Sequence, residues 1–340
     1  MNTKLATNLT LLCILIVIAG VISAFLPTQF LSVRNFSSMG RQFPEYGLLS
    51  LANMLAMITG GIDLSVTSVM SLSGVVSSLI LSQWEATALP AGAVILLGIL
   101  AALGVSAVCG LLNGFLIAYV RVPAIIATLG TQGLFLGISI GITKGHGIGG
   151  FPPPFLFIGN GDLGGIPAQF IIYIAVALLV GLLLTRTRQG FSMTMFGSSP
   201  LASRFSGVNN EAVLMKTYLI TGLLAGTASI IVISGVNSIR PGYGSEYLLV
   251  SVLIAILGGT DPVGGFGTAL GLTLGIFIMQ VLQSGLNFLG FSPFFKKFMW
   301  GLLLVGVMVF HFYRRRYAMR RAVRMSAAAR ETSSNSQAAG

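Results

Sequence analysis

Long apolar stretches recur along nearly the whole of this 340-residue chain, and no other feature constrains its fold as strongly. Hydrophobic residues make up 54% of the sequence and charged residues only 8%, whereas charged residues make up about 25% of a soluble domain. The apolar stretches do not collect at one terminus. The sequence therefore predicts one polytopic membrane unit and leaves no room for a large catalytic domain outside the bilayer.

A helix needs about 20 residues to cross a bilayer, and this length gives about ten candidate spans. They lie at residues 8–26, 46–62, 64–82, 91–120, 123–142, 169–185, 214–236, 246–258, 266–285 and 297–313. The second and eighth are short, and both end at a glycine pair. The fourth is long enough to tilt, or to break near residues 110–114. We expect an all-α fold with a single transmembrane domain over residues 1–313.

The distribution of lysine and arginine predicts the orientation, because cytoplasmic loops retain these residues. With the N-terminus inside, 13 of the 19 basic residues fall on the inner side, seven of them in the tail over residues 314–340. We expect both termini to be cytoplasmic and the tail to be partly disordered. The net charge of +11 then reflects binding of the tail to anionic lipid headgroups, and we expect no nucleic-acid partner.

An inner loop over about residues 186–215 is polar and contains the signals of a short helix. A serine precedes Pro200, and Gly207 follows two turns later. Serine as N-cap, proline in the first turn and glycine just after the last turn are typical of the two ends of a helix. Leu201 and Phe205 would share one face. The short helix either packs on its own membrane domain or forms a docking surface for a cytoplasmic partner.

No nucleotide-binding loop occurs in the sequence, since none of its five lysines follows a glycine. The two histidines, His146 and His311, are isolated, and a G-x-S-x-G at residues 137–141 lies inside an apolar span. We expect no catalytic residue, no metal site and no cofactor bound by this chain. An active transporter of this kind would need a partner to supply energy.

Four motifs, spread over roughly residues 45–310, together resemble a known family. They are Gly60-Gly61-Ile62-Asp63-Leu64-Ser65-Val66, Asn113-Gly114 followed by Val122-Pro123-Ala124-Ile125-Ile126-Ala127-Thr128-Leu129-Gly130-Thr131, Arg204-Phe205-Ser206-Gly207-Val208-Asn209, and Leu257-Gly258-Gly259-Thr260-Asp261 with Gly264-Gly265. The chain resembles the permease subunits of bacterial ABC importers for ribose, xylose, galactose, autoinducer-2 and related monosaccharide-like solutes, which are kin to branched-chain amino acid permeases.

This resemblance implies an inner-membrane permease that works with a second permease subunit, a periplasmic solute-binding protein and an ABC ATPase. The ATPase would use ATP and Mg. In such proteins the inner loop sits in a groove of the ATPase, which gives an interface role to Gly197, Ser199, Pro200, Leu201, Arg204, Phe205, Gly207 and Asn209. Many relatives have an acidic residue followed by alanines where this chain has Pro200-Leu201-Ala202.

Asp63 follows a glycine pair at the start of the third span. We expect it to cap the next helix, near the interface or in a watered cavity, because an isolated charge at the bilayer centre costs about 2.5–3.5 kcal/mol. The same Gly-Gly-x-Asp pattern recurs at Asp261, and the span count places both copies on the same side. The recurrence marks a translocation path at broken segments or is a chance similarity.

Neutral polar side chains inside the spans are the candidates for a path that carries a hydroxylated solute. With Asp63, the set comprises Asn53, Asn113, Thr128, Thr131, Gln132, Gln280, Ser284 and Asn287. The alternative for each is a hydrogen bond between helices. The outer loop over residues 143–167 is rich in glycine and proline and lacks helical periodicity. It is either a connector or a surface that receives the binding protein.

Two classes of function remain, with a passive channel as a third. The first is an ABC importer permease for a monosaccharide or a similar small solute. The second is an ion-coupled secondary transporter, which needs ionisable groups at mid-membrane. The acids lie at predicted span ends, in loops or in the tail, and this distribution favours the importer.

Overall fold

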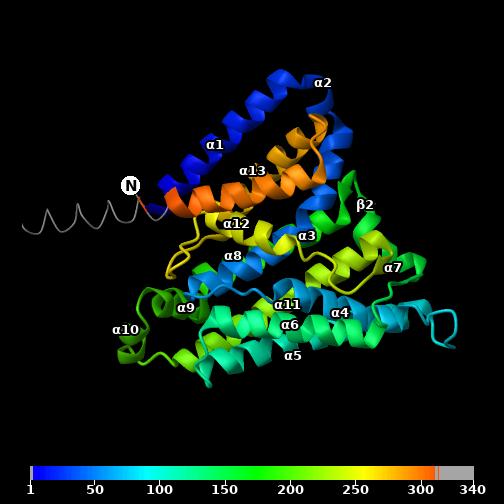
Figure 1. The fold of residues 1–340 in the computed structure, drawn as a ribbon, viewed down its shortest axis with the longest axis horizontal. Helices are drawn as coiled ribbons and strands as arrows, with labels where there is room; N and C mark the ends of the chain where they lie inside the picture. The colour runs from blue at the N-terminus through cyan, green and yellow to red at the C-terminus, as the bar shows by residue number, and fades with distance from the viewer. Residues whose placement is uncertain (1–2, 311–312, 314–340) are drawn as a thin grey trace, which may run out of the picture.

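The computed structural model describes residues 3–310 and residue 313, with side chains from residue 7 onward, and these residues are almost wholly helical (Figure 1). The helices are α1 (Thr3–Phe25), α2 (Pro27–Phe30), α3 (Val33–Ile58), α4 (Val66–Leu81), α5 (Ala91–Ala118), α6 (Ala124–Thr143), α7 (Pro153–Asn160), α8 (Ala168–Arg186), α9 (Arg188–Ser198), α10 (Pro200–Phe205), α11 (Asn210–Val236), α12 (Tyr247–Leu257) and α13 (Ala269–Phe288), followed by a helix at Pro293–Phe310. Two-residue strands form two antiparallel pairs, β1 (Ile148–Gly149) with β4 (Ser238–Ile239), and β2 (Asp162–Leu163) with β3 (Ile166–Pro167).

Each of the ten predicted spans corresponds to a helix. By length and composition, seven helices in the described part of the chain can cross a membrane: α1, α5, α6, α8, α11, α13 and Pro293–Phe310. Helices α4 and α12 are apolar but shorter. The all-α polytopic fold is therefore confirmed. The basic tail over residues 314–340 lies outside the described residues.

Helix α3 forms the centre of the molecule. Its second half is buried on every side, with Leu48, Met54 and Ile58 at most 1% exposed. A helix that is apolar all round has to be buried. Its first half was missed, because α3 begins at Val33 and not at residue 46. Polar residues there lower the hydropathy of the segment, although the backbone continues as one helix.

Helix α5 runs unbroken from Ala91 to Ala118, so the break considered near residues 110–114 is absent. The glycines there serve close packing against α11. A Cβ on Gly110 would lie 2.3 Å from the Tyr218 carbonyl oxygen, and one on Gly222 would lie 2.4 Å from the Ser106 carbonyl oxygen. Small residues let these two backbones approach as membrane helices do.

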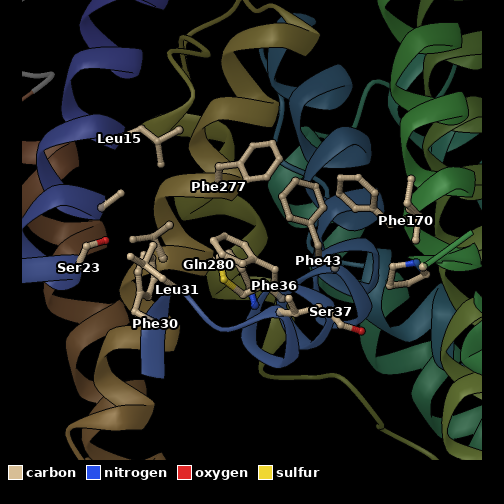
Figure 2. Close-up of a pocket in the computed structure, with 18 residues that line it drawn as sticks. Leu15, Ser23, Phe30, Leu31, Phe36, Ser37, Phe43, Phe170, Phe277 and Gln280 are labelled. Carbon is tan, nitrogen blue, oxygen red and sulfur yellow. The ribbon is translucent and has the colours of Figure 1, made fainter. Parts of the chain in front are cut away.

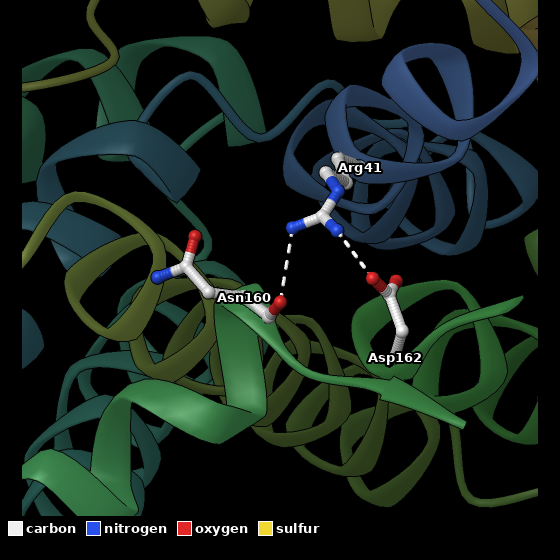
Figure 3. Close-up of polar contacts among 3 residues, drawn as sticks. All are labelled: Arg41, Asn160 and Asp162. Carbon is white, nitrogen blue, oxygen red and sulfur yellow. Dashed lines mark hydrogen bonds and ion pairs between the residues drawn. The ribbon is translucent and has the colours of Figure 1, made fainter. Parts of the chain in front are cut away.

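The two ends of the molecule differ in character (Figure 1). Helices α9 and α10 project at one end, and α2, α7 and the β2–β3 hairpin lie at the other. The loop that we expected to lack a helix contains α7, which begins with two prolines at its first turn. Arg41 of α3 ties this loop down. Its Nη2 lies 2.6 Å from Asp162 Oδ2, and its Nη1 donates to the Asn160 carbonyl at 3.0 Å (Figure 3).

Candidate functional site

The two Gly-Gly-x-Asp segments meet at the end of the molecule that carries α9 and α10. The Gly265 backbone N–H donates to the Ile58 carbonyl oxygen at 2.9 Å, which joins the end of α3 to the loop before α13. Gly60, with φ +79°, lets the chain turn directly after α3. The two segments therefore lie on the same side, as the span count predicts, and touch each other.

Gly197, near the end of α9, completes this contact. A Cβ at Gly197 would lie 1.8 Å from the Ile58 carbonyl oxygen and 2.5 Å from the Gly265 backbone nitrogen. Only a glycine fits at so close an approach of three backbones. We call Ile58, Gly60, Gly197, Gly264 and Gly265 the glycine junction, and it couples the inner loop to α3 and to the segment after α12.

Helix α10 follows the glycine junction directly and has its predicted ends. Ser199 Oγ accepts the Ala202 N–H at 3.3 Å, Pro200 is the first helical residue, and Gly207 has φ +78°. Asn209 caps the next helix, accepting the Ala212 N–H at 2.8 Å.

The exposed face of α10 is apolar. Leu201 is 66% exposed and Phe205 85% exposed, so these two residues, four apart, point away from the membrane domain. Ser203 is buried and donates to Asn210 Oδ1 at 2.9 Å, and Asn210 Nδ2 donates to the Pro200 carbonyl at 2.9 Å. The helix is thus held by its polar side and presents its apolar side. Leu201 and Phe205 therefore form an exposed apolar pair on α10.

Asp63 does not cap helix α4, so that expectation was wrong. Its Oδ1 accepts the Ser65 backbone N–H at 3.0 Å and the Ser65 hydroxyl at 2.7 Å, and its Oδ2 accepts the Thr221 hydroxyl at 3.2 Å. Helix α4 begins one residue after Ser65, and no side chain caps it. Asp63 is only 2% exposed. The carboxylate therefore fixes the turn after the first glycine pair and ties it to α11.

Asn113, Thr128 and Thr131 extend the hydrogen-bond cluster around Asp63. Asn113 Nδ2 donates to Ser65 Oγ at 2.7 Å, and its Oδ1 accepts the Thr131 hydroxyl at 2.7 Å. The Thr128 hydroxyl accepts the Leu64 N–H at 3.1 Å. All three side chains are at most 4% exposed. They connect α5 and α6 to the Asp63 turn, and Gln132 lies half-buried beside them on α6.

Asn53 lies apart from the Asp63 cluster, between α3 and α12. Its Nδ2 donates to Ser251 Oγ at 2.9 Å, and it is fully buried. Its Oδ1 has no hydrogen-bond partner among the described residues. A buried amide oxygen without a donor is costly, so a donor supplied from outside the chain would stabilise this position.

The remaining predicted residues, Gln280, Ser284 and Asn287, lie together on α13 at the opposite end. They line a polar cavity of about 200 Å³ against the first half of α3. Ser284 donates to Asn35 Oδ1 at 2.7 Å, and Lys296 donates to Asn287 Oδ1 at 2.5 Å. The structure therefore divides the predicted path residues into the Asp63 cluster near α9 and α10, the buried Asn53, and a polar cavity at the opposite end.

A second cavity beside Gln280 has the opposite character. It measures about 530 Å³ and lies between α1 and helices α3, α8 and α13 (Figure 2). Aliphatic and aromatic side chains such as Leu15, Phe43 and Phe277 line it. With so few polar groups, it cannot replace the hydrogen bonds of a hydroxylated solute.

Comparison with known proteins identifies the family. A family model described as the permease component of a branched-chain amino acid transport system matches residues 35–308. The chain belongs to this permease family. The Autoinducer 2 import system permease protein LsrD is 30% identical over 269 residues in Escherichia coli K12, in Shigella flexneri and in Escherichia coli O157:H7, and each match covers 77% of this chain and 79% of the relative. No solved structure matches the chain.

Membership of the permease family agrees with a chain made of several membrane-spanning helices. Members are permease components of transport systems and are not enzymes. Sequence reasoning missed several polar residues on the first half of α3 and facing it, namely Gln42, Glu45, Tyr46 and Tyr247. The signal was present in the spacing of Gln42, Glu45 and Tyr46, which share one helical face. The late predicted start of α3 concealed it.

Proposed function

We propose that this chain is the transmembrane permease subunit of an ATP-driven ABC importer in a bacterial cytoplasmic membrane. The observation that carries the proposal is the family match over residues 35–308. A separate ATPase would hydrolyse ATP with Mg, a second permease subunit would complete the pathway, and a periplasmic binding protein would deliver the solute. Both termini would then be cytoplasmic.

Helix α10 is the proposed docking site for the ATPase. Leu201 and Phe205 offer an exposed apolar pair, which a groove on a partner would bury. The contact at Gly197 joins this helix to the backbone of α3. A movement of the ATPase at α10 would thus reach the centre of the permease through backbone contacts and not through flexible side chains.

A monosaccharide or similar small polyhydroxylated solute is the proposed cargo. The relatives named above are permeases for autoinducer 2. Apart from Arg34, the polar side chains that line the 200 Å³ cavity on α13 are neutral amides and hydroxyls, including Asn35, Gln280 and Ser284, which both donate and accept hydrogen bonds. Such groups match a polyol better than an apolar amino acid side chain.

Reconstituted uptake with defined α10 variants tests the coupling. In proteoliposomes that contain the full complex, Leu201→Ala with Phe205→Ala should lower ATP-driven uptake and solute-stimulated ATP hydrolysis together, by roughly tenfold or more, because hot-spot residues contribute at least about 2 kcal/mol. Phe294→Ala is the matched control, since Phe294 is 81% exposed at the opposite end. Uptake driven by an ion gradient in the absence of the ATPase would refute the proposal.

A further inference from the structure

A cavity of about 290 Å³ lies between α3, α12 and the helix Pro293–Phe310, at the end opposite α10. Its lining combines carboxylates, amides and aromatic rings. The residues used below are Gln42, Glu45, Tyr46, Tyr247, Gln283 and Trp300. Its volume is at the lower limit for ligand pockets, which suits a solute the size of a monosaccharide.

Glu45 is the principal hydrogen-bond acceptor of this cavity. Its Oε2 accepts the Tyr247 hydroxyl at 2.7 Å, which holds the carboxylate in one orientation. Three other charged residues line the cavity. Lys297 lies 2.6 Å from Glu246, and Lys296 donates to the neutral Asn287. Among the described residues, no cation pairs with Glu45, so its carboxylate is available to hydroxyl donors.

The aromatic side chains are fixed in place. Tyr46 is 4% exposed and donates to Gln280 Oε1, and its ring meets the Tyr247 ring edge-on with centroids 5.9 Å apart. Trp300 is 8% exposed. A sugar has an apolar C–H face and polar edges, and rigid aromatic rings bury such a face at little entropic cost.

An amide pair connects this cavity to the 200 Å³ cavity on α13. Gln283 Nε2 donates to Gln42 Oε1 at 3.2 Å, and Gln42 lines both cavities. Each amide keeps further donor and acceptor capacity after this bond. A solute in either cavity can therefore replace the bond between the amides with bonds of its own, which would open a route between the two cavities.

We propose that the 290 Å³ cavity is the outer binding site of the permease for a neutral polyol of monosaccharide size. The solute hydroxyls donate to Glu45 and exchange hydrogen bonds with Gln42 and Gln283, and the apolar face of the solute packs on Trp300. A neutral solute fits this lining, because its two glutamates, Glu45 and Glu246, are balanced by two lysines, Lys296 and Lys297. This inference rests on the proposed function and adds the residues that recognise the solute.

The test uses proteoliposomes with the complete complex, loaded binding protein and ATP. The labelled probes are D-ribose, D-xylose, D-galactose and autoinducer 2, and the assays use whichever probe the unmodified complex accumulates. Glu45→Gln keeps the shape of the side chain but weakens acceptance from hydroxyls. Uptake should fall roughly tenfold or more, since hydrogen bonds to charged groups contribute about 1.5–3 kcal/mol. Trp300→Leu should also lower uptake, while stimulated ATP hydrolysis should stay close to the unmodified level in both variants.

Glu85→Gln is the matched control, because Glu85 is an exposed acid on the loop after α4 and lines none of these cavities. Uptake at the unmodified rate by both Glu45→Gln and Trp300→Leu would overturn the binding site and leave the proposed function intact. Parallel loss of uptake and hydrolysis in both variants would assign the cavity a structural role and would overturn the inference too. Failure of the unmodified complex to accumulate any probe with ATP would instead count against the proposed function.

Discussion

Buried polar side chains serve two different purposes in this chain. Asp63 uses both carboxylate oxygens to hold the turn after α3, and its donors are Ser65 and Thr221. Asn53 is equally buried but leaves its Oδ1 without a donor among the described residues. Satisfied groups rigidify a protein, whereas unsatisfied ones mark places where a ligand or water can bind. The hydrogen bonds of Asp63 therefore favour a structural role for this residue over an ion-coupling one.

The substitution Asp63→Asn distinguishes a structural role of Asp63, which needs its hydrogen bonds, from an ion-coupling role, which needs its charge. The asparagine keeps the oxygen that accepts from Ser65, and its amide can donate to the Thr221 hydroxyl, so uptake should remain close to unchanged. Asp63→Leu removes every acceptor and should lower the melting temperature by several degrees, since each unpaired buried group costs about 1–3 kcal/mol. Uptake and thermal unfolding of the two variants check this, and complete loss of uptake in Asp63→Asn would indicate that the charge itself is required.

Asn113 and Gln280 provide a second contrast between packing and transport. Asn113→Leu should destabilise the fold, because it removes the amide that donates to Ser65 and the amide oxygen that accepts the Thr131 hydroxyl. Gln280→Leu should reduce uptake, because Gln280 borders the polar cavity on α13, and should also lower the melting temperature, because it removes the acceptor of the buried Tyr46 hydroxyl. Uptake and melting temperature are measured on both variants. If both substitutions leave uptake unchanged, the lining role of these residues is abandoned.

The helices are the part of this architecture that the sequence could largely predict. Apolar periodicity is local, and all ten spans follow from it. The caps of α10 are equally local, and Ser199, Pro200 and Gly207 mark its ends. The first half of α3 was not predicted as part of a span, because its polar residues lower the hydropathy there, although the spacing of Gln42, Glu45 and Tyr46 marks one helical face.

The proposed binding cavity could not be predicted from the sequence either, because its residues come together only in the folded chain. Glu45 and Tyr247 are 202 residues apart in the sequence yet share a hydrogen bond. Only tertiary packing brings them together, and one sequence contains no local signal of it. The glycine junction is an intermediate case. The two Gly-Gly-x-Asp segments were found in the sequence, but the insertion of Gly197 between them required the structure.

The substitution Gly197→Ala tests the junction at the scale of whole elements. The added methyl group would overlap the Ile58 carbonyl, so α9 has to move away from α3. Overpacking of this kind costs typically about 1–3 kcal/mol. We expect a lower melting temperature and a loss of coupling, in which the ATPase still binds but hydrolysis no longer drives uptake.

Gly130→Ala is the matched control for Gly197→Ala. Gly130 lies within α6, and a Cβ there would meet no atom within 4 Å. Alanine at this position should leave uptake unchanged and favour the helix slightly. If Gly197→Ala transports as well as Gly130→Ala, the inner loop does not act through the backbone contact with α3.

At the scale of the whole molecule, α3 links the proposed solute-binding site to the proposed ATPase-docking site at α10. Glu45 lines the 290 Å³ cavity, and Ile58, on the same helix, accepts the hydrogen bond of the glycine junction. At 1.5 Å per residue the two positions are separated by about 20 Å, which is two-thirds of the hydrocarbon thickness. The second half of α3 is buried on all sides, and closely packed segments transmit strain. A displacement at the Ile58 end of α3 would therefore move the Glu45 end as well.

This arrangement requires a definite orientation in the membrane, which single-cysteine labelling can measure. The chain has two free cysteines, Cys13 and Cys109, which are first replaced by serine and alanine. Leu163→Cys then places a thiol on β2, and Phe205→Cys places one on α10. Both original side chains are exposed, so each new thiol is open to reagent unless a partner covers it.

A membrane-impermeant maleimide should label Leu163→Cys in intact spheroplasts and Phe205→Cys only in inverted vesicles. Labelling of Phe205→Cys should also decrease when the ATPase is co-expressed, because the proposed groove would cover it. The labelling pattern fixes the topology, and with it the side of the membrane on which an ATPase can reach α10. The reverse pattern would place α10 outside the cell, where no ATP-hydrolysing partner can reach it, and the coupling through the glycine junction would have to be given up.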